Sequence, residues 1–286
     1  MKKPDDFQSR RSFIFAPATR PEIFPKALKS GADIVCLELE DGVAPQDKTV
    51  ARKNAISLFQ KMRTSDGIEK MIRINSVRCK FGLDDLVAFL EAETPPPCIM
   101  LPKVQCPDEV RWIDDVLSEN NHETRLHIII ETNEGLEASF EIASASPRVD
   151  ALFFGGVDMA ADLRCNNDWD SLLYARSKVV HAAAKAKIDS LDVPYLDLDD
   201  LQGLKEQAIL ARQLGFSGKG SIHPKQIAVI NEVFTPSAEE IGYAIKVVQA
   251  FQKADTGLVV LDGKLIEKPV LREMKRILSI AEHTQR

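Results

Sequence analysis

The stretch from residue 98 to residue 132, CIMLPKVQCPDEVRWIDDVLSENNHETRLHIIIET, contains one complete strand–helix–strand unit. Its apolar runs at 98–103 and 126–132 are rich in Ile and Leu and are too short to be helices. The segment between them begins with Pro107 and two acids, which is a helix-start signal. Near-continuous apolar runs are typical of strands that are buried on both faces, as in parallel sheets.

The same alternation extends along most of the chain. Further β runs are SFIFAP (12–17), DIVCLELE (33–40), KMIRIN (70–75), ALFFGG (151–156), KIDSLDVP (187–194) and, by position more than by composition, GFSGKGSIHP (215–224). Eight β runs that alternate with helical segments predict an α/β fold of the (β/α)8 TIM-barrel type. A doubly wound open sheet is the alternative, but it would usually need fewer strands, and no GxGxxG motif opens a helix here.

The remaining residues predict a C-terminal extension. We expect the barrel to occupy residues 1–234 and a helix–hairpin–helix to occupy residues 235–286, with Asp262-Gly263 as the hairpin turn. An extension of this size is too small for a core of its own. We therefore expect it to act as a lid or as an arm that packs on a neighbouring subunit.

Composition excludes several classes of protein. The chain has 286 residues, is 44% hydrophobic and carries a net charge of −6, whereas a nucleic-acid binder would usually have a basic surplus. No run of 18 residues lacks a charge, so no transmembrane helix is expected. The five cysteines are odd in number and none has CxxC spacing. This pattern predicts a reduced cytoplasmic protein without a disulfide framework or a zinc site.

Active sites of TIM barrels lie at the C-terminal ends of the strands. In this chain those positions carry several acids and cations, namely Arg20, Glu38, Glu40, Asp41, Arg73, Lys103, Glu131 and Asp158. Glu131 and Asp158 follow adjacent β runs, and two carboxylates with open remaining positions suit Mg²⁺. The alternative is that they are solvated loop acids or pair with Arg73.

The cations of this rim suit anion recognition. Arg20 and Arg73 each carry a guanidinium fork that binds carboxylate or phosphate. The alternative is that they form structural pairs with Glu38, Glu40 or Asp41. Glu40 and Asp41 could instead hydrogen-bond to metal-bound waters.

At these residues the sequence resembles a known family. The segments RRSFIFAPATRPEIFPKAL, GADIVCLELEDGVAPQDKTVAR, IRIN, LPKV, IIETNEG, FFGGVDMAADL, GKGSIHPKQI and LDGKLIEKP resemble the citrate lyase beta-subunit-like branch of the HpcH/HpaI aldolase family. That branch includes malyl-CoA, methylmalyl-CoA and citramalyl-CoA lyases. The matching segments stand in family order and span nearly the whole chain.

The resemblance implies a role for each matching residue. It implies that Glu131 and Asp158 bind Mg²⁺, with Glu131 also at the substrate, and that Arg73 holds the carboxylate of the keto acid. Glu40 and Asp41 stand where the family orders metal-bound water. Arg20 and Lys103 are candidates for the phosphates of coenzyme A, and Arg20 also for the substrate acid.

Two positions depart from the family pattern. The family commonly reads LDLED where this chain has LELED, so Glu38 replaces an aspartate. In the hairpin motif, commonly DGKMID, Glu267 occupies the place of an aspartate that can reach the site from a neighbouring subunit as acid/base. Glutamate can do the same proton transfer. The alternative for Glu267 is a surface acid at a subunit contact.

The resemblance implies a Mg²⁺-dependent carbon–carbon lyase. We expect it to cleave or form a 3-hydroxyacyl-CoA dicarboxylate, giving a 2-keto acid (pyruvate or glyoxylate) and an acyl-CoA. The alternatives are the beta subunit of a citrate lyase-like complex that acts on a carrier-bound thioester, and a CoA-independent hydroxy-keto-acid aldolase. A thioesterase side reaction is also open. We expect a homo-oligomer, and the resemblance suggests a trimer.

Overall fold

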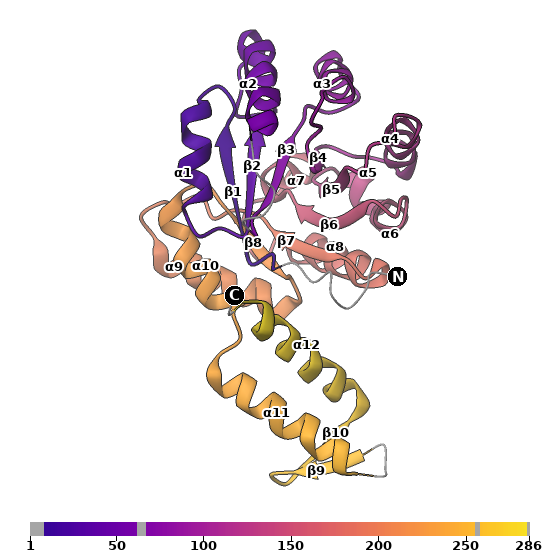
Figure 1. Ribbon diagram of the computed structural model, residues 1–286. Helices are drawn as coiled ribbons and strands as arrows, with labels where there is room; N and C mark the ends of the chain where they lie inside the picture. The colour runs from indigo at the N-terminus through magenta and orange to yellow at the C-terminus, as the bar shows by residue number, and fades with distance from the viewer. Residues whose placement is uncertain (1–8, 62–66, 255–257, 285–286) are drawn as a thin grey trace. The chain divides into compact units, whose positions relative to one another are not determined.

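The computed structural model describes residues 9–61, 67–254 and 258–284, and its parallel strands close into an eight-stranded barrel (Figure 1). The strands follow chain order, and β8 returns to pair with β1. They are β1 (Ser12–Pro17), β2 (Ile34–Glu38), β3 (Glu69–Arg73), β4 (Cys98–Leu101), β5 (Arg125–Ile130), β6 (Val149–Phe154), β7 (Asp189–Asp192) and β8 (Gly218–Ser221). The predicted TIM barrel is therefore confirmed, and so is its C-terminal helix–hairpin–helix.

Apolar side chains from every second strand residue fill the middle of the barrel. The cluster includes Phe13, Met71, Met100, Ile129 and Phe153, all of them buried. The ring of Phe13 meets that of Phe153 nearly edge to face, with centroids 5.0 Å apart. The barrel is therefore a packed core rather than a pore, and polar chemistry is confined to its two ends.

Helices surround the strands. In the barrel unit they are α1 (Phe24–Leu28), α2 (Lys48–Lys61), α3 (Lys80–Leu90), α4 (Pro107–Glu119), α5 (Asn133–Glu137), α6 (Ser139–Ala143), α7 (Gly156–Leu163), α8 (Leu173–Ala186) and α9 (Leu201–Leu214), with short 3-10 turns at Pro21–Ile23, Pro45–Asp47 and Pro224–Gln226. One predicted strand ends early: the run 151–156 stops at Phe154, and Gly156 begins α7.

The chain divides into two compact units, one of Arg10–Asn231 and one that contains the residues from Glu232 onward. The division falls within α10 (Ile227–Phe234). The boundary that the sequence predicts after residue 234 stays a prediction.

The second unit contains α11 (Ala238–Lys253), β9 (Leu258–Leu261), β10 (Lys264–Glu267) and α12 (Lys268–Thr284). A capping box of Ser237 and Glu240 begins α11. The parts of the predicted extension at residues 255–257 and 285–286 lie outside the described residues. Asp262 and Gly263 both have positive φ, as a two-residue hairpin turn of type I′ requires.

The second unit has a small apolar cluster of its own, contrary to the expectation from its length. Ala244, Val247, Ile266 and Met274 are buried in it.

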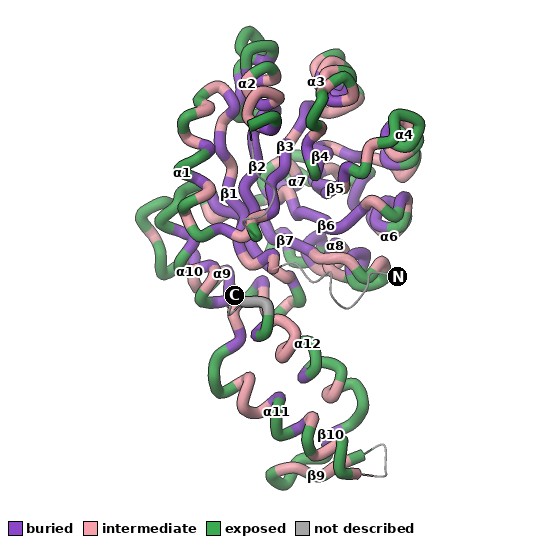
Figure 2. Tube along the Cα trace, viewed as in Figure 1, coloured by how far each residue is buried: buried purple, intermediate pink, exposed green. Residues whose placement is uncertain are grey.

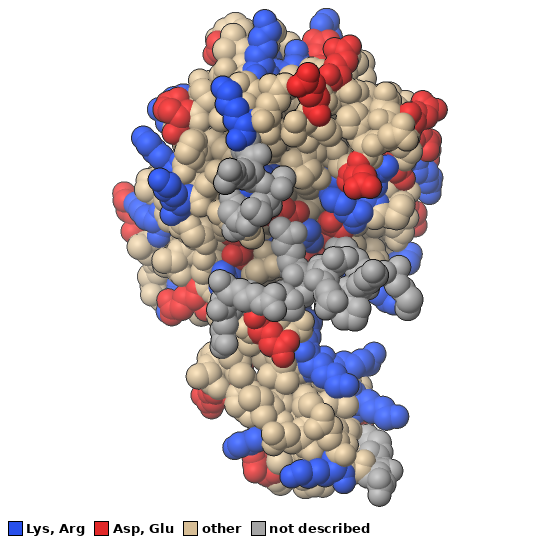
Figure 3. All heavy atoms as spheres, in the orientation of Figure 1, with Lys and Arg blue, Asp and Glu red and all other residues tan. Residues whose placement is uncertain are grey.

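Figure 2 shows that the barrel strands are buried almost throughout, whereas the helices that surround them alternate between buried and exposed residues. On the face shown in Figure 3, acidic and basic side chains are interspersed over the barrel unit. No helix within the described ranges is long and apolar enough to cross a bilayer.

Candidate active site

The predicted site residues of the barrel unit lie at the C-terminal ends of the strands. Glu38 ends β2, Arg73 ends β3, and Glu131 directly follows β5. Asp158 lies in the first turn of α7, because the chain turns into a helix at Gly156 instead of continuing the strand. It is nevertheless at the same end of the barrel as the other three, since α7 begins two residues after β6.

Glu131 is 3% exposed, and its position is fixed by two neighbours. The backbone N–H of Lys103 donates to Glu131 Oε1 over 2.8 Å. Gly155 leaves room on the other side: a Cβ atom there would lie 2.4 Å from Glu131 Cβ and 2.5 Å from its Oε2. Position 155 therefore requires a glycine beside this carboxylate. The sequence alone did not indicate that Gly155 has this role.

The environment of Glu131 disfavours a bare negative charge. Burial, and then the negative charges of Asp158 and Glu40, raise the pKa of the Glu131 carboxyl to about 8. Among the described residues at this end of the barrel, acidic side chains therefore outnumber basic ones. A divalent cation held by Glu131 and Asp158 would remove this imbalance, and two carboxylates are the usual protein share of a Mg²⁺ site. The donor set fits the metal that the sequence predicts.

Arg73 is held by the two buried acids of β2 and the loop after it. Its Nε donates to Glu38 Oε2 over 2.5 Å, and its Nη1 lies 3.2 Å from Glu40 Oε2. The guanidinium carbon also lies 4.6 Å from the centroid of the Phe15 ring. The alternative of a structural pair with Glu38 and Glu40 is therefore present, and Arg73 also lines a pocket at this end of the barrel.

Lys103 places its ammonium among the acids. Its Nζ is hydrogen-bonded to Glu40 and lies 3.0 Å from Asp41 Oδ1 and 3.9 Å from Asp158 Oδ1. The ammonium therefore bridges the two acidic positions after β2 and the acid on α7. Its predicted role in binding coenzyme A stays a prediction.

The two remaining predicted residues are Arg20 and Glu267. Arg20 is exposed where the first 3-10 turn begins, and it is not part of the pocket lining. Glu267 is exposed at the end of β10, in the second unit. Their predicted roles stay predictions.

A pocket of about 150 Å³ opens beside these residues. Arg73, Glu131 and Asp158 line it together with apolar side chains that include Phe15, Ile129 and Phe153. Its lining is therefore mainly apolar with a few convergent charges, as is usual for small-molecule sites.

Asp192 also lines this pocket and was missed by sequence reasoning. It is 1% exposed and accepts from Lys219 Nζ over 2.5 Å and from Arg176 Nε over 2.9 Å. The available signal was an acid at the end of the seventh β run, in KIDSLDVP. Its partners come from β8 and α8, so only the fold shows that it is held in place.

Known proteins share this architecture and sequence. The family model described as HpcH/HpaI aldolase/citrate lyase matches residues 11–224. The chain belongs to this family. Because the family model covers all eight strands, the resemblance noted in the sequence is confirmed, and with it the assignment to carbon–carbon lyases.

Relatives over the full length place the chain in the predicted branch of the HpcH/HpaI family. It is 34% identical over 291 residues to the mitochondrial citramalyl-CoA lyase of Mus musculus, covering 95% of this chain and 86% of that protein. It is 32% identical to the L-malyl-CoA/beta-methylmalyl-CoA lyase of Rhodobacter capsulatus, and the match covers 98% of this chain and 96% of that protein. Among solved structures, the chain is similar to CitE from Mycobacterium tuberculosis, crystallised in complex with magnesium, acetoacetate and coenzyme A. The sequences are 30% identical, the match covers 96% of this chain and 98% of the CitE chain, and the TM-score is 0.81.

Proposed function

We propose that this chain is a Mg²⁺-dependent lyase that cleaves, or forms, a 3-hydroxyacyl-CoA dicarboxylate such as citramalyl-CoA or malyl-CoA. The products of cleavage are a 2-keto acid, pyruvate or glyoxylate, and an acyl-CoA. The observation that carries this proposal is the buried Glu131 carboxylate beside Asp158, in one pocket with Arg73. Relatives named for citramalyl-CoA and malyl-CoA support the substrate class.

Glu131 and Asp158 are the residues that would hold the metal, and a CitE structure with magnesium supports its identity. Bound Mg²⁺ supplies a Lewis acid that polarises the oxygen destined to become the keto group. Glu40 and Asp41, both hydrogen-bonded to Lys103 Nζ, would hydrogen-bond to water bound by this metal.

Arg73 is the proposed carboxylate clamp. Its Nε and Nη1 are directed to Glu38 and Glu40, so the guanidinium is held rigidly at the wall of the pocket. A pre-positioned guanidinium orients a keto-acid carboxylate without a further ordering cost. The apolar lining, which includes Phe15 and Phe153, excludes water from the bond that breaks.

Cleavage needs one proton to leave the substrate hydroxyl and one to reach the acyl-CoA enolate. We assign the second transfer to Glu267, acting from a neighbouring subunit in a homo-oligomer, with a trimer as the expected form. Glu267 pairs with Leu258 across the hairpin, and Leu265 pairs with Val260. Leu258, Val260 and Leu265 are 49%, 71% and 60% exposed, so the acid stands beside an apolar surface suited to docking.

The direct test is cleavage of free citramalyl-CoA and malyl-CoA by the purified chain with Mg²⁺, measured as release of keto acid. We expect wild type and the control Glu134→Gln, an exposed acid three residues away, to be active. Glu131→Gln is expected to lose activity. Equal rates for Glu131→Gln and wild type would overturn the metal assignment.

The substrates of the test also separate the other candidate functions. Activity only on a carrier-bound thioester would favour a citrate lyase-like beta subunit instead. Activity on simple hydroxy-keto acids would favour a CoA-independent aldolase, and release of free acid with CoA would indicate a thioesterase step. The cytoplasmic location stays a prediction.

A further inference from the structure

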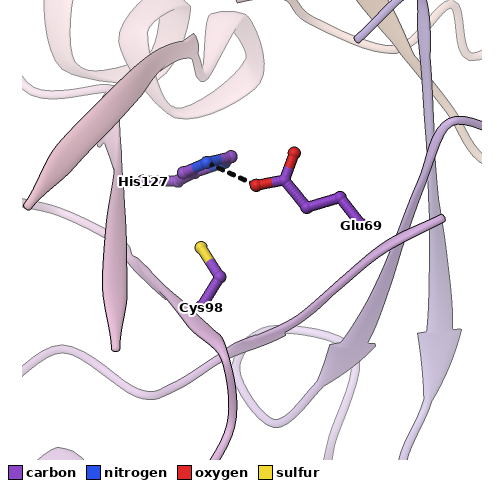
Figure 4. A group of neighbouring side chains, drawn as sticks. All are labelled: Glu69, Cys98 and His127. Carbon is purple, nitrogen blue, oxygen red and sulfur yellow. Dashed lines mark ion pairs between the residues drawn. The ribbon is translucent and has the colours of Figure 1, made fainter. Parts of the chain in front are cut away.

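A second polar group lies in the barrel, at the end opposite the pocket. Glu69 and Cys98 are the first residues of β3 and β4, and His127 lies on β5. Figure 4 shows that the three side chains point toward one another. One ligand atom from each residue lies within 4.8 Å of the other two. All three residues are buried.

The ring of His127 is the unexplained part of this group. It is 0% exposed, and its Nε2 lies 3.0 Å from Glu69 Oε1. Despite that distance, neither ring nitrogen has a hydrogen-bond partner of acceptable geometry within the described part of the chain. Buried polar atoms are nearly always paired, and one that is unpaired calls for an explanation such as an ion.

The charges around the group favour an added cation. Arg10 pairs with Glu69 and Asp189 and lies 3.6 Å from Asp150, while Arg125 also pairs with Asp150. Two guanidiniums and three carboxylates thus lie around the proposed ligands, so this end of the barrel is rich in acids.

We propose that Glu69, Cys98 and His127 form a zinc site at the N-terminal end of the barrel, in which the protein supplies three ligands. Imidazole nitrogen, thiolate sulfur and carboxylate oxygen are the donors that Zn²⁺ takes, whereas Mg²⁺ selects oxygen. On binding, the Cys98 thiol releases its proton to solvent and the sulfur bonds to the metal. The dication and the thiolate together add a single positive charge to this acidic cluster.

This site is independent of the proposed function, because none of its ligands lines the catalytic pocket. It also differs from the sequence-based expectation of no zinc site. Cysteine spacing gave no signal because each ligand comes from a different strand, at positions 69, 98 and 127. Only closure of the barrel brings them together.

The test is zinc content by elemental analysis, on full-length protein produced with added zinc and then dialysed against a weak chelator. We expect about one zinc per chain in wild type. The same content is expected in Glu131→Gln/Asp158→Asn, in which the proposed Mg²⁺ site is disabled. Wild type without zinc, or zinc that is lost in this double variant, would overturn the proposal.

Cys36 supplies a matched control, because it is a second buried thiol of the barrel core. Zinc should be retained in Cys36→Ala and lost in Cys98→Ala and His127→Gln. In Co²⁺-loaded protein, a thiolate-to-metal absorption band should be present in Cys36→Ala and absent in Cys98→Ala. A band that persists without Cys98 would overturn the assignment even if the zinc contents agreed.

Discussion

Arg73 Nε donates to Glu38 Oε2 over 2.5 Å, and the two residues are direct partners in the register of β2 and β3. The backbone N–H of Glu40 donates to the other Glu38 oxygen, so this one carboxylate orders both the clamp and the start of the acidic loop. Burial raises the pKa of Glu38, while Arg73 opposes that change. Glu38 therefore supports the site through both of its carboxylate oxygens.

Shortening Glu38 should weaken substrate binding. In Glu38→Asp the carboxylate retreats from Arg73, and losing a charge-assisted hydrogen bond should raise KM by about 10-fold or more, with a smaller change in kcat. Steady-state kinetics with citramalyl-CoA would measure this. Asp84→Asn is the control, because it disturbs surface pairs with Lys80 and Arg52 and no residue of the pocket. An unchanged KM in Glu38→Asp would show that Arg73 does not depend on Glu38.

A methyl group at Gly155 should disable the site without unfolding the barrel. Its Cβ would meet Glu131 at 2.4 Å, so the carboxylate must move, and a displacement of this size can cost about 100-fold in rate. Mg²⁺ titration and kcat/KM of Gly155→Ala would measure the loss. Gly242→Ala is the control, because nothing lies within 4 Å of a Cβ there. Normal Mg²⁺ binding in Gly155→Ala would contradict the placement of Glu131.

The barrel and its rim were within reach of sequence reasoning, because buried parallel strands have near-continuous apolar runs and the active end follows from strand direction. The contacts that individual side chains make could not be predicted in this way. Asp158 lies on a helix because the chain turns at Gly156, and the Lys103 ammonium lies among acids that are distant in sequence. The placement of Asp192 likewise depends on partners from other elements.

The buried pair of Lys219 and Asp192 should matter for stability. Both side chains are 0% exposed, and burial lowers the pKa of Lys219 while Asp192 opposes that change. Lys219→Met leaves Asp192 with one cation instead of two, and breaking a buried pair costs about 3–5 kcal/mol. Urea unfolding would measure this. Lys225→Met, which breaks an exposed pair with Asp199, should cost less than about 1 kcal/mol. Equal losses of unfolding free energy in the two variants would show that the buried pair stabilises the protein no more than the exposed pair does.

The proposed role of Glu267 predicts complementation between inactive subunits. Glu131→Gln has an impaired barrel site and an intact hairpin, whereas Glu267→Gln has the reverse. If the hairpin acts on a neighbouring subunit, oligomers reassembled from an equal mixture should have about a quarter of their sites complete. If each hairpin acts on its own barrel, no site is complete.

Activity of the reassembled mixture, compared with each variant alone, separates these outcomes. Each variant must also be dissociated and reassembled by itself, which controls for activity gained from refolding. Val260→Ser/Leu265→Ser tests the docking surface, because both side chains are exposed on the hairpin and their loss removes apolar area from any contact. We expect this double variant to lose complementation. Its oligomer should also dissociate at a higher protein concentration than that of wild type. Full complementation by the double variant would show that this apolar surface does not dock the hairpin.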